Sequence, residues 1–113
     1  MTRIFFSSGD VSGDIHGANL IRALRRLEPE LVCEGLGGQR MAAAGMDLHY
    51  DLAGQGIMGF VEVVKQLGHV RRLFNDALAH WEHARPDCLV VIDFPGFNLR
   101  LAAKAAQRGI PVV

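Results

Sequence analysis

Short apolar runs alternate with amphipathic segments along the whole chain. The runs are β-rich or unbroken, as in strands buried on both faces, and cover residues 3–7, 31–38, 47–52, 87–93 and 110–113. Between them, apolar residues recur at helical spacing in 15–27, 40–46, 60–83 and 98–108. The pattern therefore predicts strands and helices in regular alternation, with neither repeats nor a linker.

Such alternation is typical of an α/β fold with a doubly wound parallel sheet, Rossmann-like, for which we expect the strand order 3-2-1-4-5. The first and fourth strands are then neighbours. The loops at 8–14 and 93–98 should therefore meet above the carboxyl edge of the sheet, where such folds place their ligands.

Composition narrows the class of protein. The 113 residues are half apolar and carry 12 basic and 12 acidic side chains, which predicts one domain over 1–113 and no nucleic-acid partner. Cys33 and Cys88 lie in apolar runs without a histidine at metal-ligand spacing, so we expect reduced, buried thiols and a cytoplasmic protein. We expect neither a signal peptide nor a spanning helix.

The first loop, SSGDVSGDIHG at residues 7–17, offers glycines for close backbone approach at Gly9 and Gly13. Its polar candidates are the side chains of Asp10, Ser12, Asp14 and His16. A carboxylate at a helix N-terminus competes with phosphate for the free amides, so the loop is better suited to hydroxyl groups, as on a sugar. Alternatively, Ser12 or Asp14 only caps the helix.

The loop after the fourth strand contributes Asp93 and Asn98. Asp93 ends an apolar strand before a Pro-Gly turn, and we expect a partly buried carboxylate suited to act as a general base. The alternative is that it only forms the turn.

The segment 56–81 is apolar over more than one helical stripe and carries interleaved basic residues. This combination favours contact with an anionic membrane or an acyl chain through Val61, Val64 and Leu67. Packing on the sheet or on another domain is the alternative.

Four blocks carry a family resemblance: SSGDVSGDIHGANLIRAL, GLGGQRMAAAGM, IMGFVEVV and VVIDFPGFNLRLA. In order and spacing they resemble the lipid-A-disaccharide synthases, inverting glycosyltransferases of the GT-B type. The resemblance implies the front part of the N-terminal, acceptor-binding domain, without the C-terminal donor domain, so that these residues alone should be inactive.

The resemblance also implies roles for individual residues. The family's Gly-Glu-x-Ser-Gly-Asp loop falls on residues 9–14, where Asp10 replaces the glutamate and shortens its reach. It implies a catalytic Asp93, with Asn98 as a substrate-binding residue and Asp10 or Asp14 as substitute bases. Further substrate-binding positions by resemblance, which are equally a structural helix entry, are Met58, Gly59 and Glu62.

The implied reaction joins UDP-2,3-diacylglucosamine to 2,3-diacylglucosamine 1-phosphate, giving lipid A disaccharide 1-phosphate and UDP without metal or cofactor. The implied location is the inner face of the bacterial inner membrane, with a homodimer plausible through the donor domain. A flavodoxin-like cofactor module and a non-catalytic remnant that binds lipid or a partner are the alternatives.

Overall fold

The computed structural model describes the backbone of residues 2–55 and 60–113, and the side chains of residues 2–53 and 68–113. Its strands are β1 (Arg3–Ser8), β2 (Val32–Gly37), β3 (Asp47–Asp51) and β4 (Cys88–Ile92). Its helices are α1 (Val11–Leu27), α2 (Gln39–Ala43), α3 (Leu52–Gln55), α4 (Phe60–His83) and α5 (Pro95–Gln107). The predicted alternation of strands and helices is confirmed.

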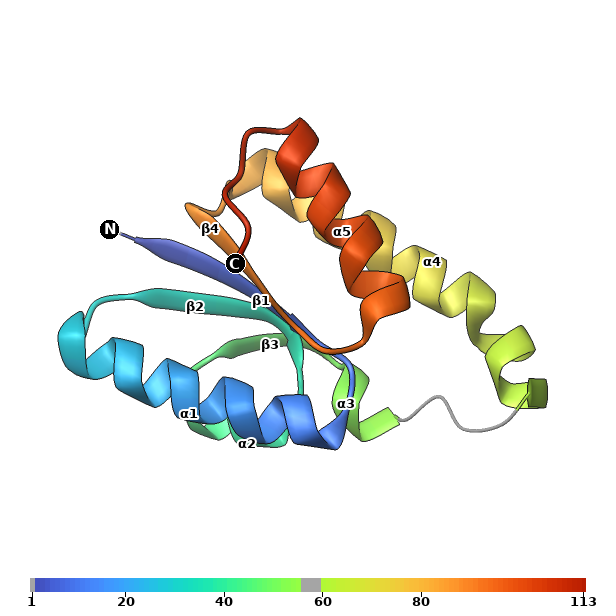
Figure 1. Cartoon of the computed structure of the whole chain (residues 1–113), viewed down its shortest axis with the longest axis horizontal. Helices are drawn as coiled ribbons and strands as arrows, with labels where there is room; N and C mark the ends of the chain where they lie inside the picture. The colour runs from blue at the N-terminus through green and yellow to red at the C-terminus, as the bar shows by residue number, and fades with distance from the viewer. Residues whose placement is uncertain (1, 56–59) are drawn as a thin grey trace.

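The four strands form one parallel sheet in the order β3-β2-β1-β4. Helices α1 and α2 cover one face, and α4 and α5 cover the other (Figure 1). This is the doubly wound, Rossmann-like arrangement that the sequence predicts, with β1 and β4 side by side.

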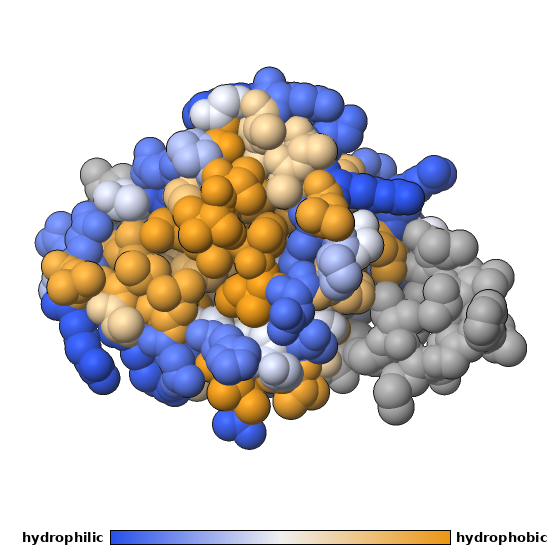
Figure 2. Space-filling view, viewed as in Figure 1, coloured by the Kyte–Doolittle hydropathy of each residue, from blue (hydrophilic) through white to orange (hydrophobic). Residues whose placement is uncertain are grey.

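The expected fifth strand is reduced to a single bridge. Val112 pairs in parallel with Leu89, and the Val113 amide donates to the Leu89 carbonyl over 2.9 Å. The segment nevertheless lies where the predicted order puts it, on the outer edge of β4. Apolar side chains gather on the surface over this edge (Figure 2), and both Val112 and Val113 are exposed.

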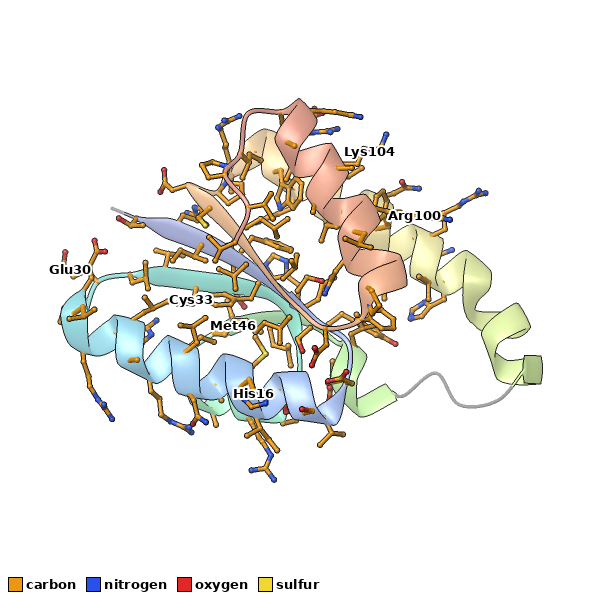
Figure 3. All side chains as sticks on the ribbon, viewed as in Figure 1. His16, Glu30, Cys33, Met46, Arg100 and Lys104 are labelled. Atoms are coloured by element: carbon orange, nitrogen blue, oxygen red, sulfur yellow. The ribbon has the colours of Figure 1, made fainter. Side chains whose placement is uncertain are left out.

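Successive residues of β1 point to opposite faces, so Phe5 and Phe6 are fully buried in two separate apolar cores. Phe5 packs among α4 and α5 residues and meets Trp81 edge to face, with ring centroids 5.5 Å apart. The second core lies between α1 and the sheet, where Figure 3 shows Cys33 and Met46.

Both cysteines are free thiols. Cys33 is buried as expected, whereas Cys88 is only half-buried, since it lies at the start of β4 beside the sheet edge. None of the helices in the described part of the chain combines the length and the hydropathy that a membrane span requires.

Two helices start earlier than their periodicity predicts. Helix α1 begins at Val11 rather than at 15, because the Asp10 carboxylate caps it by accepting a 2.6 Å hydrogen bond from the Gly13 amide. Helix α5 begins at Pro95 rather than at 98, a first-turn position at which proline needs no amide partner. The short α3 carries too few residues to show a period.

Candidate functional site

The loops after β1 and β4 meet, as the strand order predicts. Gly9 lies directly against the Phe94 ring: a Cβ at Gly9 would lie 2.4 Å from two of the ring carbons. Gly13 lies against the end of β1, since its Cβ would lie 2.1 Å from the Ser8 hydroxyl oxygen and 3.3 Å from the Ile92 side chain. Glycine at position 9 is therefore required by the close approach of the two loops, and glycine at position 13 by the packing of α1 on Ser8.

Asn98, in the first turn of α5, connects the ends of β1 and β4 through hydrogen bonds. It is 2% exposed, and its Oδ1 accepts a 2.6 Å hydrogen bond from the Ser7 hydroxyl. Its Nδ2 faces three backbone carbonyls, those of Ser7 at 3.0 Å, Asp93 at 2.7 Å and Ile92 at 3.3 Å. The contacts recorded for the buried Asn98 side chain are thus with the protein itself, and they fix the turn that presents Asp93.

Asp93 stands at the carboxyl edge of the sheet with its side chain exposed, so the expectation of partial burial is wrong. Asp93 and Phe94 both adopt left-handed backbone conformations, with φ of 52° and 49°. Two successive residues other than glycine in this region store strain of roughly 1–2 kcal/mol each. Strain of this kind is found at functional turns and is maintained by surrounding contacts, here those of Asn98.

The first loop is shorter than expected, because Ser12, Gly13 and Asp14 are the second to fourth residues of α1. Ser12 and His16 are exposed on that helix, and Asp10 is half-buried with its carboxylate on the Gly13 amide. The cap of α1 is therefore Asp10, rather than Ser12 or Asp14.

Asp14 caps a different helix. Its carboxylate accepts hydrogen bonds from the amides of Arg40 at 3.2 Å and Met41 at 3.0 Å, at the start of α2. The side chain is buried, and Gly38 leaves room for it, because a Cβ there would lie 2.4 Å from the carboxylate. Asp14 thus joins α1 to α2 through hydrogen bonds between residues that are far apart in the sequence.

A small hollow of about 180 Å³ lies beside Asp14 at the carboxyl ends of the strands. The residues that line it are Val11, Asp14, Gln39, Arg40, Asp51 and Ala53. Asp93 does not belong to this lining. The structure therefore brings the two loops together through Gly9, Phe94 and Asn98, but it places Asp14 and Asp93 at separate points of the edge.

A larger cavity, of about 510 Å³, lies between α4 and α5. Its apolar lining comes from Val70, Phe74 and Phe97, and the rings of the two phenylalanines meet edge to face at 5.7 Å. Two arginines also line it, Arg71 on α4 and Arg100 on α5, the latter labelled in Figure 3, together with Gly68 and Asn75. An apolar trough with guanidinium groups at its rim is suited to a molecule that carries both acyl and anionic groups.

Several predicted site residues lie outside the described part of the chain. Met58 and Gly59 belong to the undescribed backbone. For Glu62, Val61, Val64 and Leu67, the α4 backbone is described and the side chains are not.

Sequence reasoning missed Ser7 and Phe94, which build this edge together with the predicted residues. Ser7 follows three apolar residues and reads as part of a strand. Phe94 reads as a core residue, although a left-handed φ and contact with Gly9 define its role. Only the order of the strands could have indicated that both lie at one edge.

Comparison with known proteins gives a consistent result. A family model described as lipid-A-disaccharide synthetase matches residues 4–112. The chain is 42% identical to a lipid-A-disaccharide synthase of Koribacter versatilis, and the match covers 100% of this chain and 30% of that protein. It is 39% identical to the enzyme of that name from Geobacter sulfurreducens, covering 98% of this chain and 29% of the relative.

Among solved structures, the chain resembles MurG of Acinetobacter baumannii with a TM-score of 0.62. The match covers 99% of this chain and 33% of that one, at 9% sequence identity, and so shows a shared fold. The chain spans about 30% of the length of the relatives it matches in sequence.

Proposed function

Because the chain belongs to the lipid-A-disaccharide synthetase family, we propose that it supplies the acceptor-binding part of an inverting glycosyltransferase. The proposed reaction transfers the glucosaminyl unit of UDP-2,3-diacylglucosamine to the 6-hydroxyl of 2,3-diacylglucosamine 1-phosphate. The observation that carries the proposal is the set of hydrogen bonds made by the Asn98 side chain. These bonds join the ends of β1 and β4 and hold the Asp93 turn at the carboxyl edge.

In this proposal Asp93 is the catalytic residue. Its exposed carboxylate takes the proton of the acceptor hydroxyl while that oxygen forms a bond to the anomeric carbon of the donor. The bond from the anomeric carbon to UDP breaks in the same displacement, and its electron pair leaves with the diphosphate. A single displacement of this kind inverts the configuration at that carbon.

The other residues of this edge have binding or positioning roles in the proposal. Ser12 is exposed in the first turn of α1 and is available to a sugar hydroxyl, whereas Asp10 and Asp14 hold helix starts in place. Gly9 and Gly13 are positioning residues in the proposal, because the space that a Cβ would occupy is filled by Phe94 and Ser8. Met58, Gly59 and Glu62 are proposed for the acceptor pocket on the family resemblance alone.

We further propose that a donor-binding domain completes the site, and that the apolar surface over the β4 edge packs against more of the same protein. The exposure of Val112 and Val113 there supports this. The α4–α5 cavity, with Arg71 and Arg100, supports contact with the acylated substrate or an anionic membrane surface. Val61, Val64 and Leu67 are proposed for the same contact from the sequence pattern alone.

The test is Asp93→Asn in the intact protein, assayed with both diacylated substrates. Loss of a general base lowers kcat by about 10²- to 10⁴-fold. Asp76→Asn, an exposed carboxylate on α4, is the matched control and should leave kcat unchanged. Near-normal turnover of Asp93→Asn would remove Asp93 from the base role, and an inactive wild-type protein would favour the non-catalytic lipid-binding alternative. Family membership favours both the transferase and the non-catalytic lipid-binding alternative over a flavodoxin-like module.

A further inference from the structure

A second cluster of chemically competent side chains lies on the α4 face of the sheet. Glu34 on β2, His49 on β3 and His80 on α4 each offer a ligand atom, and the three atoms lie within 4.8 Å of one another. Glu34 precedes the end of β2 by three residues, so about 10 Å of strand separates it from the carboxyl edge. The cluster is therefore separate from the Asp93 turn.

The donor set determines what such a cluster would bind. Two imidazoles and one carboxylate form a set typical of zinc, with ligand bonds of about 2.0–2.2 Å and a fourth position open to water. The two histidine rings are nearly perpendicular, with centroids 4.6 Å apart, and His80 Nε2 already contacts Glu34 Oε1. An ion would replace the direct contact between His80 and Glu34, and both histidine side chains would shift so that their nitrogens lie about 2.0–2.1 Å from it.

One outer contact already orients the carboxylate. Arg3 donates to the second oxygen of Glu34 over 2.5 Å, which leaves Oε1 directed at the histidines. A contact of this kind from a second layer holds a metal ligand in position and strengthens binding. Asp47, two residues before His49 on the same face of β3, has a carboxylate oxygen 3.8 Å from His49 Nε2, which is beyond hydrogen-bonding distance and adds only a negative charge beside the cluster.

The burial of the cluster fits a site with one open side. The Glu34 side chain is 5% exposed, while those of His49 and His80 are 26% and 32% exposed. The carboxylate thus lies at the inner end and the imidazoles at the entrance, where an ion can enter from solvent. One ion here would tie β2, β3 and α4 together.

From this geometry we infer that Glu34, His49 and His80 form a binding site for one divalent transition-metal ion of the zinc class. An ion bound there would crosslink three elements at a distance from the proposed base, and its fourth coordination position would be open to water. The site is independent of the transferase reaction and would stand if that proposal failed.

The test is titration of the intact, EDTA-treated protein with ZnCl₂ by calorimetry, together with thermal unfolding. We expect one Zn²⁺ per chain and a raised Tm. His49→Ala and His80→Ala should each weaken binding at least about tenfold, since even outer-layer changes cost 10- to 100-fold. The matched control is His83→Ala, an exposed histidine one turn from His80 on the same helix, which should bind as the wild type does.

Co²⁺ absorption distinguishes this site from the two free cysteines. Nitrogen and oxygen ligands give d–d bands without thiolate charge transfer, and we expect that spectrum. The inference is overturned if wild-type protein binds no Zn²⁺, if His49→Ala binds as tightly as wild type, or if Co²⁺ shows a thiolate band. His49 is a surface position, so its variant should fold even where a Glu34 variant does not.

Discussion

Asn98 and Ser7, ninety-one residues apart in the sequence, share two hydrogen bonds in the buried interior: the Ser7 hydroxyl donates to Asn98 Oδ1, and Asn98 Nδ2 donates to the Ser7 carbonyl. This pair makes the carboxyl edge of the sheet a single unit, because the same Nδ2 group also holds the Asp93 carbonyl.

Replacing Asn98 by alanine should therefore destabilise the protein substantially. Each buried partner left unsatisfied costs about 1–3 kcal/mol, and the Ser7 hydroxyl and the Asp93 carbonyl would both lose theirs. Chemical denaturation measures the change in the free energy of unfolding. Leu99→Ala, at the neighbouring exposed position on α5, should change it by less than about 1 kcal/mol. Equal changes in the free energy of unfolding for the two variants would contradict a stabilising role of the Asn98 hydrogen bonds.

Gly9→Ala and Gly96→Ala should have opposite outcomes. A Cβ at Gly9 meets the Phe94 ring at 2.4 Å, whereas a Cβ at Gly96 meets nothing within 4 Å and lies in the first turn of α5. We expect Gly9→Ala to lose about 1–3 kcal/mol by overpacking and Gly96→Ala to be neutral or stabilising. Thermal unfolding of both variants is the measurement.

The double variant Gly9→Ala with Phe94→Ala tests the cause. If the clash with the ring explains the loss, removing the ring should recover part of it, and the two changes should be non-additive by more than about 0.5 kcal/mol. Strict additivity would mean that Gly9 is needed for another reason.

Asp14→Ala should destabilise the protein through α2 rather than α1. It removes the acceptor for the Arg40 and Met41 amides, and loss of a cap costs about 0.5–2 kcal/mol. Hydrogen exchange should rise at Arg40 and Met41. Asp10→Asn serves as the control, since asparagine caps a helix as well as aspartate does; faster exchange confined to α1 in Asp14→Ala would refute this assignment.

The arginines of the α4–α5 cavity should contribute to attraction toward anionic lipid. We expect Arg71→Ala with Arg100→Ala to reduce partitioning of the intact protein onto phosphatidylglycerol vesicles, because each cation near such a surface contributes about 1 kcal/mol. The charge-matched control is Arg22→Ala with Arg26→Ala on α1. An equal reduction in both pairs would indicate attraction by overall charge alone.

The Cys33 thiol should react slowly. Burial raises the pKa of Cys33, outweighing the opposite effect of Arg25, so less thiolate exists at a given pH than in an unfolded chain. Alkylation of Cys33 by iodoacetamide at pH 8 should be slower in the folded protein than in urea. The rate of alkylation should increase as pH rises. Because the pKa of Cys33 is raised, its thiol becomes a thiolate at higher pH than an ordinary cysteine does. A rate equal to that in urea would show that Cys33 is accessible.

The sequence was sufficient for the sheet and insufficient for the roles of its acidic residues. Periodicity predicted which segments are strands and which are helices, and the preferences of doubly wound sheets with right-handed crossovers favoured the order in which the four strands are found. Asp10 and Asp14 are equivalent by local rules, and only the distance between α1 and α2 decides that one caps its own helix and the other its neighbour's.

Glu34, His49 and His80 were not predicted, because a metal motif is recognised by close spacing and these residues are scattered. Glu34 and His80 are 46 residues apart, and each reads as an ordinary polar residue in its own element. The exposure of Asp93 was not predicted either. The apolar run before it indicates a buried strand, but it does not show that the chain reaches the surface of the protein at residue 93.

At the paired left-handed residues that end β4, the stability of the fold and the chemistry proposed for Asp93 favour different residues. Glycine at position 93 would adopt φ of 52° without this strain, whereas aspartate does so at a cost of roughly 1–2 kcal/mol. Directed evolution for heat tolerance alone should therefore drift toward Asp93→Gly, and the survivors would be robust proteins that have given up their carboxylate.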